Sequence, residues 1–161
     1  MKTIAAFIIS SLFLVSTVSA SSTEEQNKAF AKQAFEEILS KGNFFRARQF
    51  YATDFINHGL YRDGNLEEDQ SVLKGLHQAF SELVIQPQKL MSEGDLVTIY
   101  WTACGRNTGA ANGIPATGKR VLSSGIIIWR VADGRIKEQW SACDQLSMME
   151  QLGLVALKND N

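Results

Sequence analysis

Apolar residues recur every three to four positions in two segments of the first half of the chain, which is the spacing of an amphipathic helix. The first segment predicts a helix that Ser22 or Thr23 can cap and that Gly42 ends. The second segment predicts a helix over residues 66–83. Each helix would bury one apolar face and expose its polar face.

The region between these two helices has a weaker pattern. Residues 44–51 form a short amphipathic stretch, in which Phe45, Ala47 and Phe50 are expected to face inward. Residues 53–65 contain glycine breakers and are predicted to form a loop.

Beyond Pro87 the spacing changes to every second residue, which is typical of strands that face the core on one side. Asp133-Gly134 indicates a tight hairpin between two of these strands. The predicted strands lie at 90–104, 119–131 and 135–143, with a glycine-rich connection at 105–118 and a closing helical turn at 146–152.

Helices followed by an antiparallel meander predict an α+β fold, with the helices packed on one face of a curved sheet. A curved sheet closed by helices forms a cone, and the mouth of a cone is a natural ligand pocket. The length of 161 residues suits one domain. With 16 Lys and Arg against 17 Asp and Glu, the chain lacks the basic surplus that nucleic-acid binding needs.

The first 20 residues have the pattern of a secretory signal peptide. Lys2 is positively charged, residues 5–15 are largely apolar, and residues 18–20 offer small side chains to a signal peptidase. We therefore expect a mature domain of residues 21–161, exported to the periplasm or secreted, with no membrane attachment after cleavage. An uncleaved N-terminal membrane anchor is the alternative.

Cys104 and Cys143 would then lie in an oxidising compartment, yet the strand order argues against a disulfide between them. Counting outward from the hairpin turn places Cys143 opposite Ser124. Cys104 should lie near 122–124 on the other side of the same strand. Two strand spacings separate such residues by roughly 9–10 Å, whereas a disulfide needs Cα atoms within about 7 Å.

A set of short segments, none of them specific alone, follows one another in a characteristic order. The segments are Tyr51–His58, Glu93–Val97, Gly105–Gly109, Gly113–Lys119, Arg130–Ile136 and Glu138–Trp140, followed by Asp144 and Gln151–Gly153. In this order and spacing they resemble the SnoaL-like polyketide cyclases, also called ester cyclases. The resemblance covers nearly all of the chain after the signal segment.

The resemblance implies a nuclear-transport-factor-2-like cone and acid–base chemistry that uses no cofactor and no metal. The residue at Asp144 would take a proton from the carbon beside a carbonyl of a small apolar substrate. The enolate would attack a second carbonyl of the same molecule, and the acid would return its proton to the new oxyanion. His58 and the segment 105–109 would line the same pocket.

A homodimer is also implied by the resemblance. The apolar pattern agrees, because Tyr100, Ile127 and Trp129 add more apolar sheet surface than the predicted helices need to cover. A second copy of the chain is therefore an expected partner.

Asp144 and His58 are the candidate catalytic residues, and each has a structural alternative. Trp101 and Trp140 could supply apolar walls that raise the pKa of Asp144 and make it a better base. The alternative is that Asp144 caps the helical turn that follows it. His58 could orient a substrate carbonyl or share a proton with Asp144, or it could bond to the backbone of a loop.

The sequence departs from the family pattern at Asn107, where the family usually has His, and at Arg106, where it has Thr. Asn107 can donate a hydrogen bond to a carbonyl but cannot titrate near neutral pH. Arg106 could polarise a carbonyl or hold a carboxylate, or it could serve only loop solubility. Two hypotheses result: a cofactor-free cyclase or isomerase, and a module that binds a ligand or partner without turnover.

Overall fold

The computed structural model describes residues 16–156, with side chains from residue 23 onward. Most of the expected signal segment, residues 1–15, lies outside the described residues. The first helix begins at Ser16, so it already spans the expected cleavage site after Ala20. The elements are α1 Ser16–Ala34, a π-helical segment Phe35–Ser40, a 3₁₀ segment Phe44–Gln49, β1 Tyr51–His58, α2 Leu66–Ala79, β2 Phe80–Glu93, β3 Leu96–Asn107, β4 Arg120–Ala132, β5 Arg135–Cys143 and α3 Gln145–Leu152.

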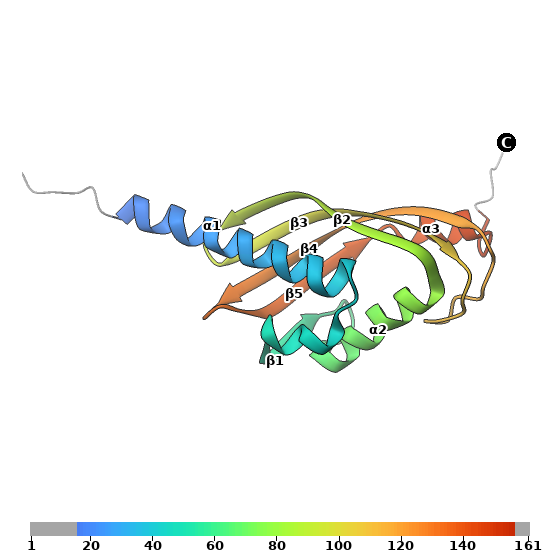
Figure 1. The fold of residues 1–161 in the computed structure, drawn as a ribbon, viewed down its shortest axis with the longest axis horizontal. Coiled ribbons are helices and arrows are strands. Elements are labelled where there is room, and N and C mark those ends of the chain that lie inside the picture. The colour runs from blue at the N-terminus through green and yellow to red at the C-terminus, as the bar shows by residue number, and fades with distance from the viewer. Residues whose placement is uncertain (1–15, 157–161) are drawn as a thin grey trace, which may run out of the picture.

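The strands form one curved sheet in the order β1-β5-β4-β3-β2. Neighbouring strands are antiparallel, except that β1 runs parallel to β5. Figure 1 shows α1 lying across one face of this sheet, with α3 at the opposite end of the sheet from the start of α1. This arrangement confirms the predicted α+β fold with helices on one face of the sheet.

The core lies between the sheet and the first helical segments. Val97 and Ile99 of β3 are fully buried, as their alternation predicts, and Phe35 and Ile38 reach them from the helical side. Trp129 of β4 is also fully buried, with its ring 6.3 Å from that of Phe35. The apolar faces of the helical segments and of the strands therefore pack together in one layer.

Phe45 in the segment 44–49 was wrongly predicted to face inward. Its side chain is 86% exposed. The segment is a 3₁₀ helix, which has three residues per turn. Phe44, Ala47 and Phe50 therefore share the inward face, and Phe45 points to solvent.

Element boundaries also differ from the prediction; for example, the strand predicted at 90–104 is divided between β2 and β3. The two largest differences lie elsewhere. The segment expected to be a loop at 53–65 contains most of β1, whose pairing with β5 shifts between Tyr51 and Ile56 and so hides a regular alternation. The helix predicted at 66–83 ends at Ala79, because the following residues pair with β3 as part of β2. In both cases a partner strand distant in sequence overrides the local pattern.

Cys104 and Cys143 are both free and lie on strands that flank β4, as predicted. Cys104 is opposite Leu122, and Cys143 is opposite Gly125 rather than Ser124. The shift by one residue comes from the irregularity where β5 passes Arg130 of β4, which adds one residue to β5.

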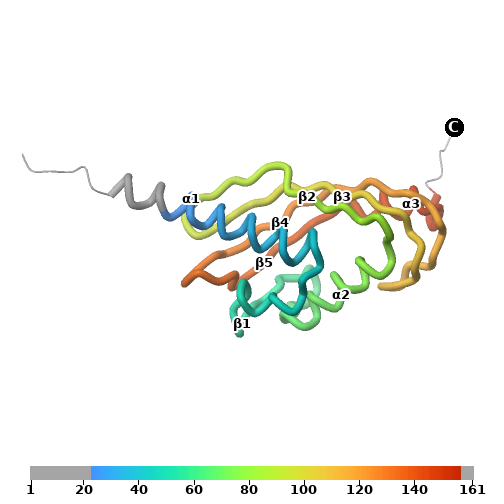
Figure 2. The backbone as a smooth tube through the Cα atoms, viewed as in Figure 1, coloured from blue at the N-terminus to red at the C-terminus, as the bar shows by residue number. Residues whose placement is uncertain are grey.

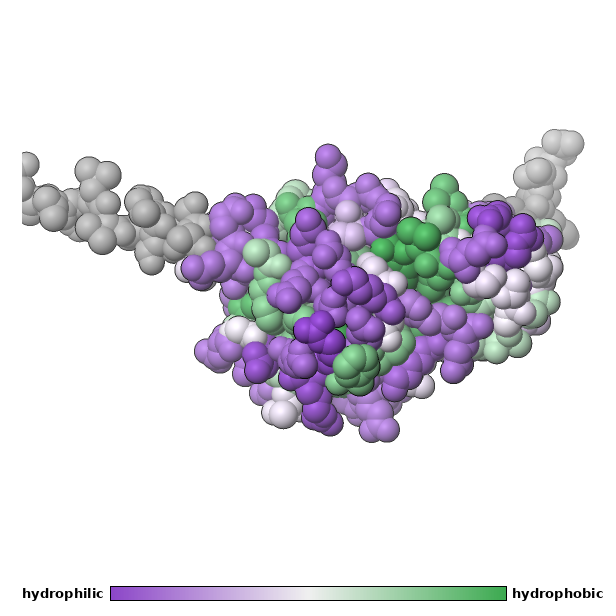
Figure 3. Space-filling model, viewed as in Figure 1, coloured by the Kyte–Doolittle hydropathy of each residue, from purple (hydrophilic) through white to green (hydrophobic). Residues whose placement is uncertain are grey.

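The outer face of the sheet, away from α1, is partly apolar. Tyr100 is 38% exposed and Ile126 is 46% exposed. Ile127 and Trp129, expected to contribute to such a surface, are instead buried beneath the helices, so that part of the prediction was wrong. Figure 3 shows the face seen in Figure 1, where hydrophilic side chains dominate and hydrophobic ones form small areas. Within residues 16–156, each helix is too short or too polar to cross a bilayer.

Candidate functional site

The parallel pair β1 and β5 carries polar side chains on both of its faces. Asn57 is the register partner of Gln139, and His58 is the partner of Trp140. Since side chains alternate along a strand, one pair faces the helices and the other faces outward. Figure 2 shows the position of α2 next to β1. Asn57 and Gln139 both bond to Asp69 of α2, so this helix covers the inner pair.

The inner network is centred on Asp69 of α2. The helix starts with a reciprocal cap between Asn65 and Glu68, which places Asp69 in its first turn. Its Oδ1 accepts hydrogen bonds from Asn57 Nδ2 at 2.8 Å and Gln139 Nε2 at 3.0 Å. Asp69 thereby joins α2 to the sheet.

Gln139 extends this network into the core. It is 4% exposed, and its Oε1 accepts a hydrogen bond from Trp129 Nε1 at 2.7 Å. The amide is therefore held at both ends, which fixes its NH₂ group toward Asp69. A buried amide in this position orients the carboxyl group without adding charge.

The surroundings of Asp69 favour its neutral form. Burial raises the pKa of this carboxyl, and the hydrogen bonds from Gln139 and then Asn57 oppose the rise only in part. Both donors are neutral amides, so within the described part of the chain the carboxylate has amide partners and no paired cation. A carboxyl with a raised pKa is better matched to taking and returning a proton near neutral pH.

Tyr51 lies on the same side of β1, at the edge of the core. Its ring meets Phe55 edge-on at 4.9 Å and Trp129 at 6.1 Å. The hydroxyl group is buried and has no hydrogen-bond partner within the described part of the chain. Burial, followed by the nearby charge of Asp69, raises the pKa of Tyr51, so the hydroxyl stays protonated and available as a donor.

The outer face carries a second, charged cluster around His58. Nε2 of His58 lies 2.9 Å from Glu138, Nδ1 lies 3.3 Å from Asp63, and the ring stacks on Trp140 with centroids 4.6 Å apart. Glu138 also pairs with Arg130. The hydrogen bond that His58 donates to Glu138 raises the pKa of His58, with smaller contributions from Asp63. The structure thus joins two predicted site residues, His58 and Trp140.

Asp144 is not joined to His58. It is exposed, and its carboxylate caps α3 by accepting a hydrogen bond from Ser147 N at 3.1 Å. It follows Trp140, the register partner of His58, by four residues, which is about 13 Å along a strand. The geometry matches the helix-cap alternative and offers no direct proton transfer between Asp144 and His58.

Asn107 and Arg106 are engaged in holding the glycine-rich connection. Asn107 is fully buried; its Nδ2 donates to Ala79 O and Gly109 O, and its Oδ1 accepts from the backbone and hydroxyl of Thr117. Arg106 donates to Gly118 O at 2.7 Å. Both side chains therefore bind the chain's own backbone; Asn107 is fully buried, whereas Arg106 is only partly buried.

Trp101 lies on the inner face of the sheet. It is half-buried and packs against the core cluster, with its ring directly over Gly125 of β4. A methyl group at Gly125 would meet the indole ring at 2.4 Å, so the glycine is required for this packing. Trp101 is therefore a wall residue of the inner face, separate from the His58–Trp140 stack on the outer face.

Sequence reasoning missed Asp69 and Tyr51. A signal for Asp69 was present, because it falls between Leu66 and Leu73 on the apolar side of α2, where a charged residue is out of place. Tyr51 had no such signal, since an aromatic residue before a predicted loop reads as ordinary core. Within the described residues, no group of three His, Cys, Asp or Glu side chains is placed to hold a metal ion.

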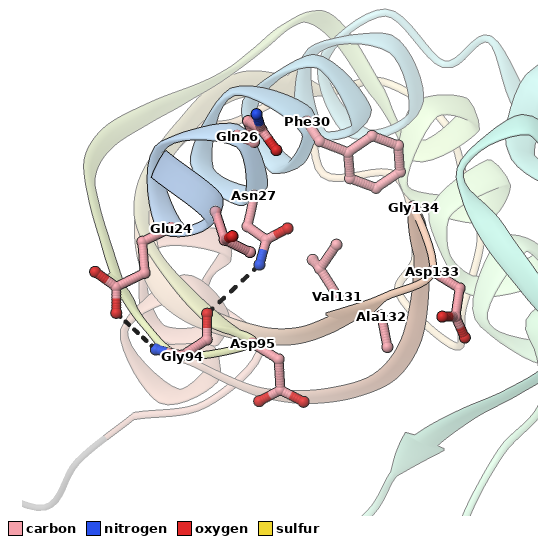
Figure 4. Close-up of a pocket in the computed structure, with 11 residues that line it drawn as sticks. Glu24, Gln26, Asn27, Phe30, Gly94, Asp95, Val131, Ala132, Asp133 and Gly134 are labelled. Atoms are coloured by element: carbon pink, nitrogen blue, oxygen red, sulfur yellow. Dashed lines mark hydrogen bonds between the residues drawn. The ribbon is translucent and has the colours of Figure 1, made fainter. Parts of the chain in front are cut away.

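A hollow of about 910 Å³ opens at the end of the cone, between α1 and the two hairpin turns. Figure 4 shows Phe30 and Val131 at its centre and Asp95 and Asp133 at its edge. Val131 pairs with Ile136, and Ile136 pairs with Tyr51, so the floor of the hollow is about two strand spacings, roughly 10 Å, from Tyr51.

Comparison with known proteins identifies one family for this chain. The family model of the SnoaL-like polyketide cyclases matches residues 29–152. IdmH from Streptomyces antibioticus is 25% identical, with a TM-score of 0.68, over 80% of this chain and 99% of that chain. TsrD from Streptomyces laurentii is 23% identical, with a TM-score of 0.71, over 80% of this chain and 98% of that chain. No curated protein gives a significant match.

A SnoaL-like polyketide cyclase from Agrobacterium tumefaciens is 18% identical, with a TM-score of 0.62, over 75% of this chain and 94% of that chain. At this identity the likeness shows the fold alone, which is the nuclear-transport-factor-2-like cone. The family model, in contrast, extends from α1 to the end of α3 and confirms the resemblance of the ordered segments. The chain belongs to the SnoaL-like polyketide cyclase family.

Proposed function

We propose that this chain is an exported enzyme that performs acid–base chemistry at a carbon beside a carbonyl group, without a cofactor. Its family supports a cyclase- or isomerase-type function. The observation that carries the proposal is the environment of Asp69. Its carboxyl has a raised pKa and is oriented by two neutral amides on the helix-covered face of the sheet.

The proposed reaction conserves electrons and protons within the substrate and one carboxyl group. The carboxylate takes a proton from the carbon beside the carbonyl, and the electrons of the broken C–H bond move onto the carbonyl oxygen. In a cyclisation, the enolate carbon forms a bond to a second carbonyl carbon of the same molecule, and the carboxylic acid protonates the resulting alkoxide. In an isomerisation, the acid returns the proton to another carbon.

Asp144 and His58 remain rival candidates for the acid–base role, as the family resemblance implies. Asp144 is exposed and caps α3, and His58 is paired with Glu138 and Asp63 on the outer face. Their positions separate them from the inner network. Parallel substitution of each candidate therefore distinguishes the outer residues from Asp69.

A second candidate function is the binding of a small apolar carbonyl compound without turnover. The observation that favours it is that Asp144 and Asn107, at the family's functional positions, make structural hydrogen bonds here. A ligand that stabilises the protein against heat but undergoes no reaction would support this function.

Solvent deuterium exchange distinguishes the two functions before the natural substrate is known. The mature protein is incubated in D₂O with cyclohexanone or ethyl acetoacetate, and NMR follows replacement of the hydrogens beside the carbonyl. An enzyme of the proposed kind accelerates exchange over the rate without protein. Binding detected by thermal shift, with exchange at the background rate for every compound tried, would refute the enzymatic proposal.

Export and dimer formation complete the proposal. The mature chain begins at Ser21, which mass spectrometry of the exported protein checks; intact Met1 would refute it. The partly exposed Tyr100, Leu122 and Ile126 on the sheet support a homodimer that covers them. Light scattering that gives a monomer mass at all concentrations would refute the dimer.

A further inference from the structure

Two polar atoms of the inner network have no partner. Asn57 and Gln139 both donate to Oδ1 of Asp69, and its Oδ2 accepts no hydrogen bond within residues 16–156. The Tyr51 hydroxyl is likewise without a partner in that part of the chain, although Tyr51 is only 3% exposed. Buried polar groups are nearly always hydrogen-bonded, so the Tyr51 hydroxyl indicates a ligand site. Among the described side-chain atoms this hydroxyl is the one that is both buried and unpaired, whereas Oδ2 of Asp69 is an acceptor that remains open to solvent and lies close enough for the charge of Asp69 to act on Tyr51.

From this pair we infer that Tyr51 and Asp69 form a two-point site for a small enolisable ketone or ester. The Tyr51 hydroxyl donates to the carbonyl oxygen, and Oδ2 of Asp69 faces the hydrogen on the adjacent carbon. This inference rests on the proposed function, because it assigns the atoms that perform it. Tyr51 and Asp69 are then both catalytic residues.

The surroundings suit the charge that develops in this reaction. Phe55 and Trp129 enclose the tyrosine ring, so the hydroxyl acts in an apolar setting where a hydrogen bond to an oxyanion is strong. The groups around the Asp69 carboxyl are neutral, because the amides of Asn57 and Gln139 orient it by hydrogen bonds.

Each step balances between these two groups and the substrate. Asp69 takes the proton as the C–H bond breaks, and the electron pair moves to the carbonyl oxygen, which the Tyr51 hydroxyl stabilises as an oxyanion. Asp69, now a carboxylic acid, returns the proton to the product carbon or to the alkoxide formed by ring closure. The tyrosine keeps its own proton throughout.

The N-terminal half of α2 covers this site. The buried residues of α2, Gly75 and Ala79, lie in its C-terminal half, whereas Leu66 at its start is only partly buried. The hydrogen bonds of Asp69 provide the polar link between the first turn and the sheet. These bonds keep the carboxyl of Asp69 in place beside β1 and β5.

Binding of 4-nitrophenol tests the site independently of turnover, because its anion carries negative charge on one oxygen as an enolate does. Titration is followed by the absorbance of the phenolate. Tyr51→Phe should weaken binding roughly ten- to hundredfold, because one hydrogen bond to a charged oxygen is lost. The control is Tyr61→Phe, since Tyr61 is 96% exposed and outside the network, and its affinity should not change.

A second measurement does not depend on any variant's folding. The chain has three tyrosines, and ¹³C labelling at Cζ gives each a resonance that reports on its hydroxyl. We expect 4-nitrophenol to shift one of them, the one missing from Tyr51→Phe. Absent binding, a shift confined to Tyr61 or Tyr100, or equal affinity in Tyr51→Phe would overturn the inference. Deuterium exchange that persists in Tyr51→Phe would leave the proposed function standing and remove Tyr51 from it.

Discussion

The Tyr51→Phe variant should be more stable than the natural protein in the absence of ligand. Folding removes water from the Tyr51 hydroxyl, and residues 16–156 supply no partner in return. Such a loss costs about 1–3 kcal/mol in protein mutational data. Phenylalanine keeps the ring contacts with Phe55 and Trp129 and omits the hydroxyl, so the variant should recover about 1 kcal/mol or more of unfolding free energy.

Urea unfolding followed by tryptophan fluorescence measures this difference. With a denaturant slope of about 2 kcal/mol/M, a gain of about 1 kcal/mol raises the midpoint by roughly 0.5 M. The control Tyr61→Phe changes an exposed hydroxyl and should stay within about 0.5 kcal/mol of the natural protein. If Tyr51→Phe were instead destabilised by about 1 kcal/mol or more, the hydroxyl would have a stabilising partner and the ligand argument would fail.

Three further predictions concern the other charged groups. Asp144→Ala should lose about 1 kcal/mol of stability through loss of the α3 cap, whereas Asp144→Asn, which still caps, should lose little; urea midpoints compare them. NMR titration should place the His58 pKa above 6.5. The interaction of protonated His58 with Glu138 then stabilises the fold fully below pH 6.5 and is lost as pH rises through the raised pKa. A Glu138→Gln variant that left the His58 pKa unchanged would count against this. Hydrogen bonds, first from Lys41, lower the pKa of Glu37 to about 2. The ionised Glu37 therefore stabilises the fold fully above about pH 4.5, and this stabilisation declines as pH falls toward 2. Urea unfolding should show that Glu37→Gln loses less stability than the natural protein on acidification over that range.

The strands and the core were predictable because their alternation is local. Val97 and Ile99 lie on the predicted face of β3, and the hairpin turn at Asp133-Gly134 starts the register where it was expected. The cysteine positions followed from this register with an error of one residue. The error arose because an extra residue within β5 leaves no mark in the hydrophobic pattern.

The candidate site was less predictable because long-range pairing builds it. Asn57 and Gln139 are 82 positions apart and meet only through the parallel pairing of β1 with β5. The local pattern predicted a loop where most of β1 lies. The raised pKa of Asp69 depends on burial by that same pairing. The family resemblance predicted a site residue at Asn107, but its hydrogen bonds hold the glycine-rich connection of the chain itself.

We propose that Asp69, rather than Asp144, is the acid–base residue. Deuterium exchange into cyclohexanone tests it directly when the natural protein is compared with Asp69→Asn, Asp144→Asn and the control Glu67→Gln, an exposed carboxylate in the same turn of α2. We expect exchange to fall by roughly 100-fold or more in Asp69→Asn and to be unchanged in the other two variants. Exchange that survives in a folded Asp69→Asn variant, or that is lost in Asp144→Asn, would contradict it.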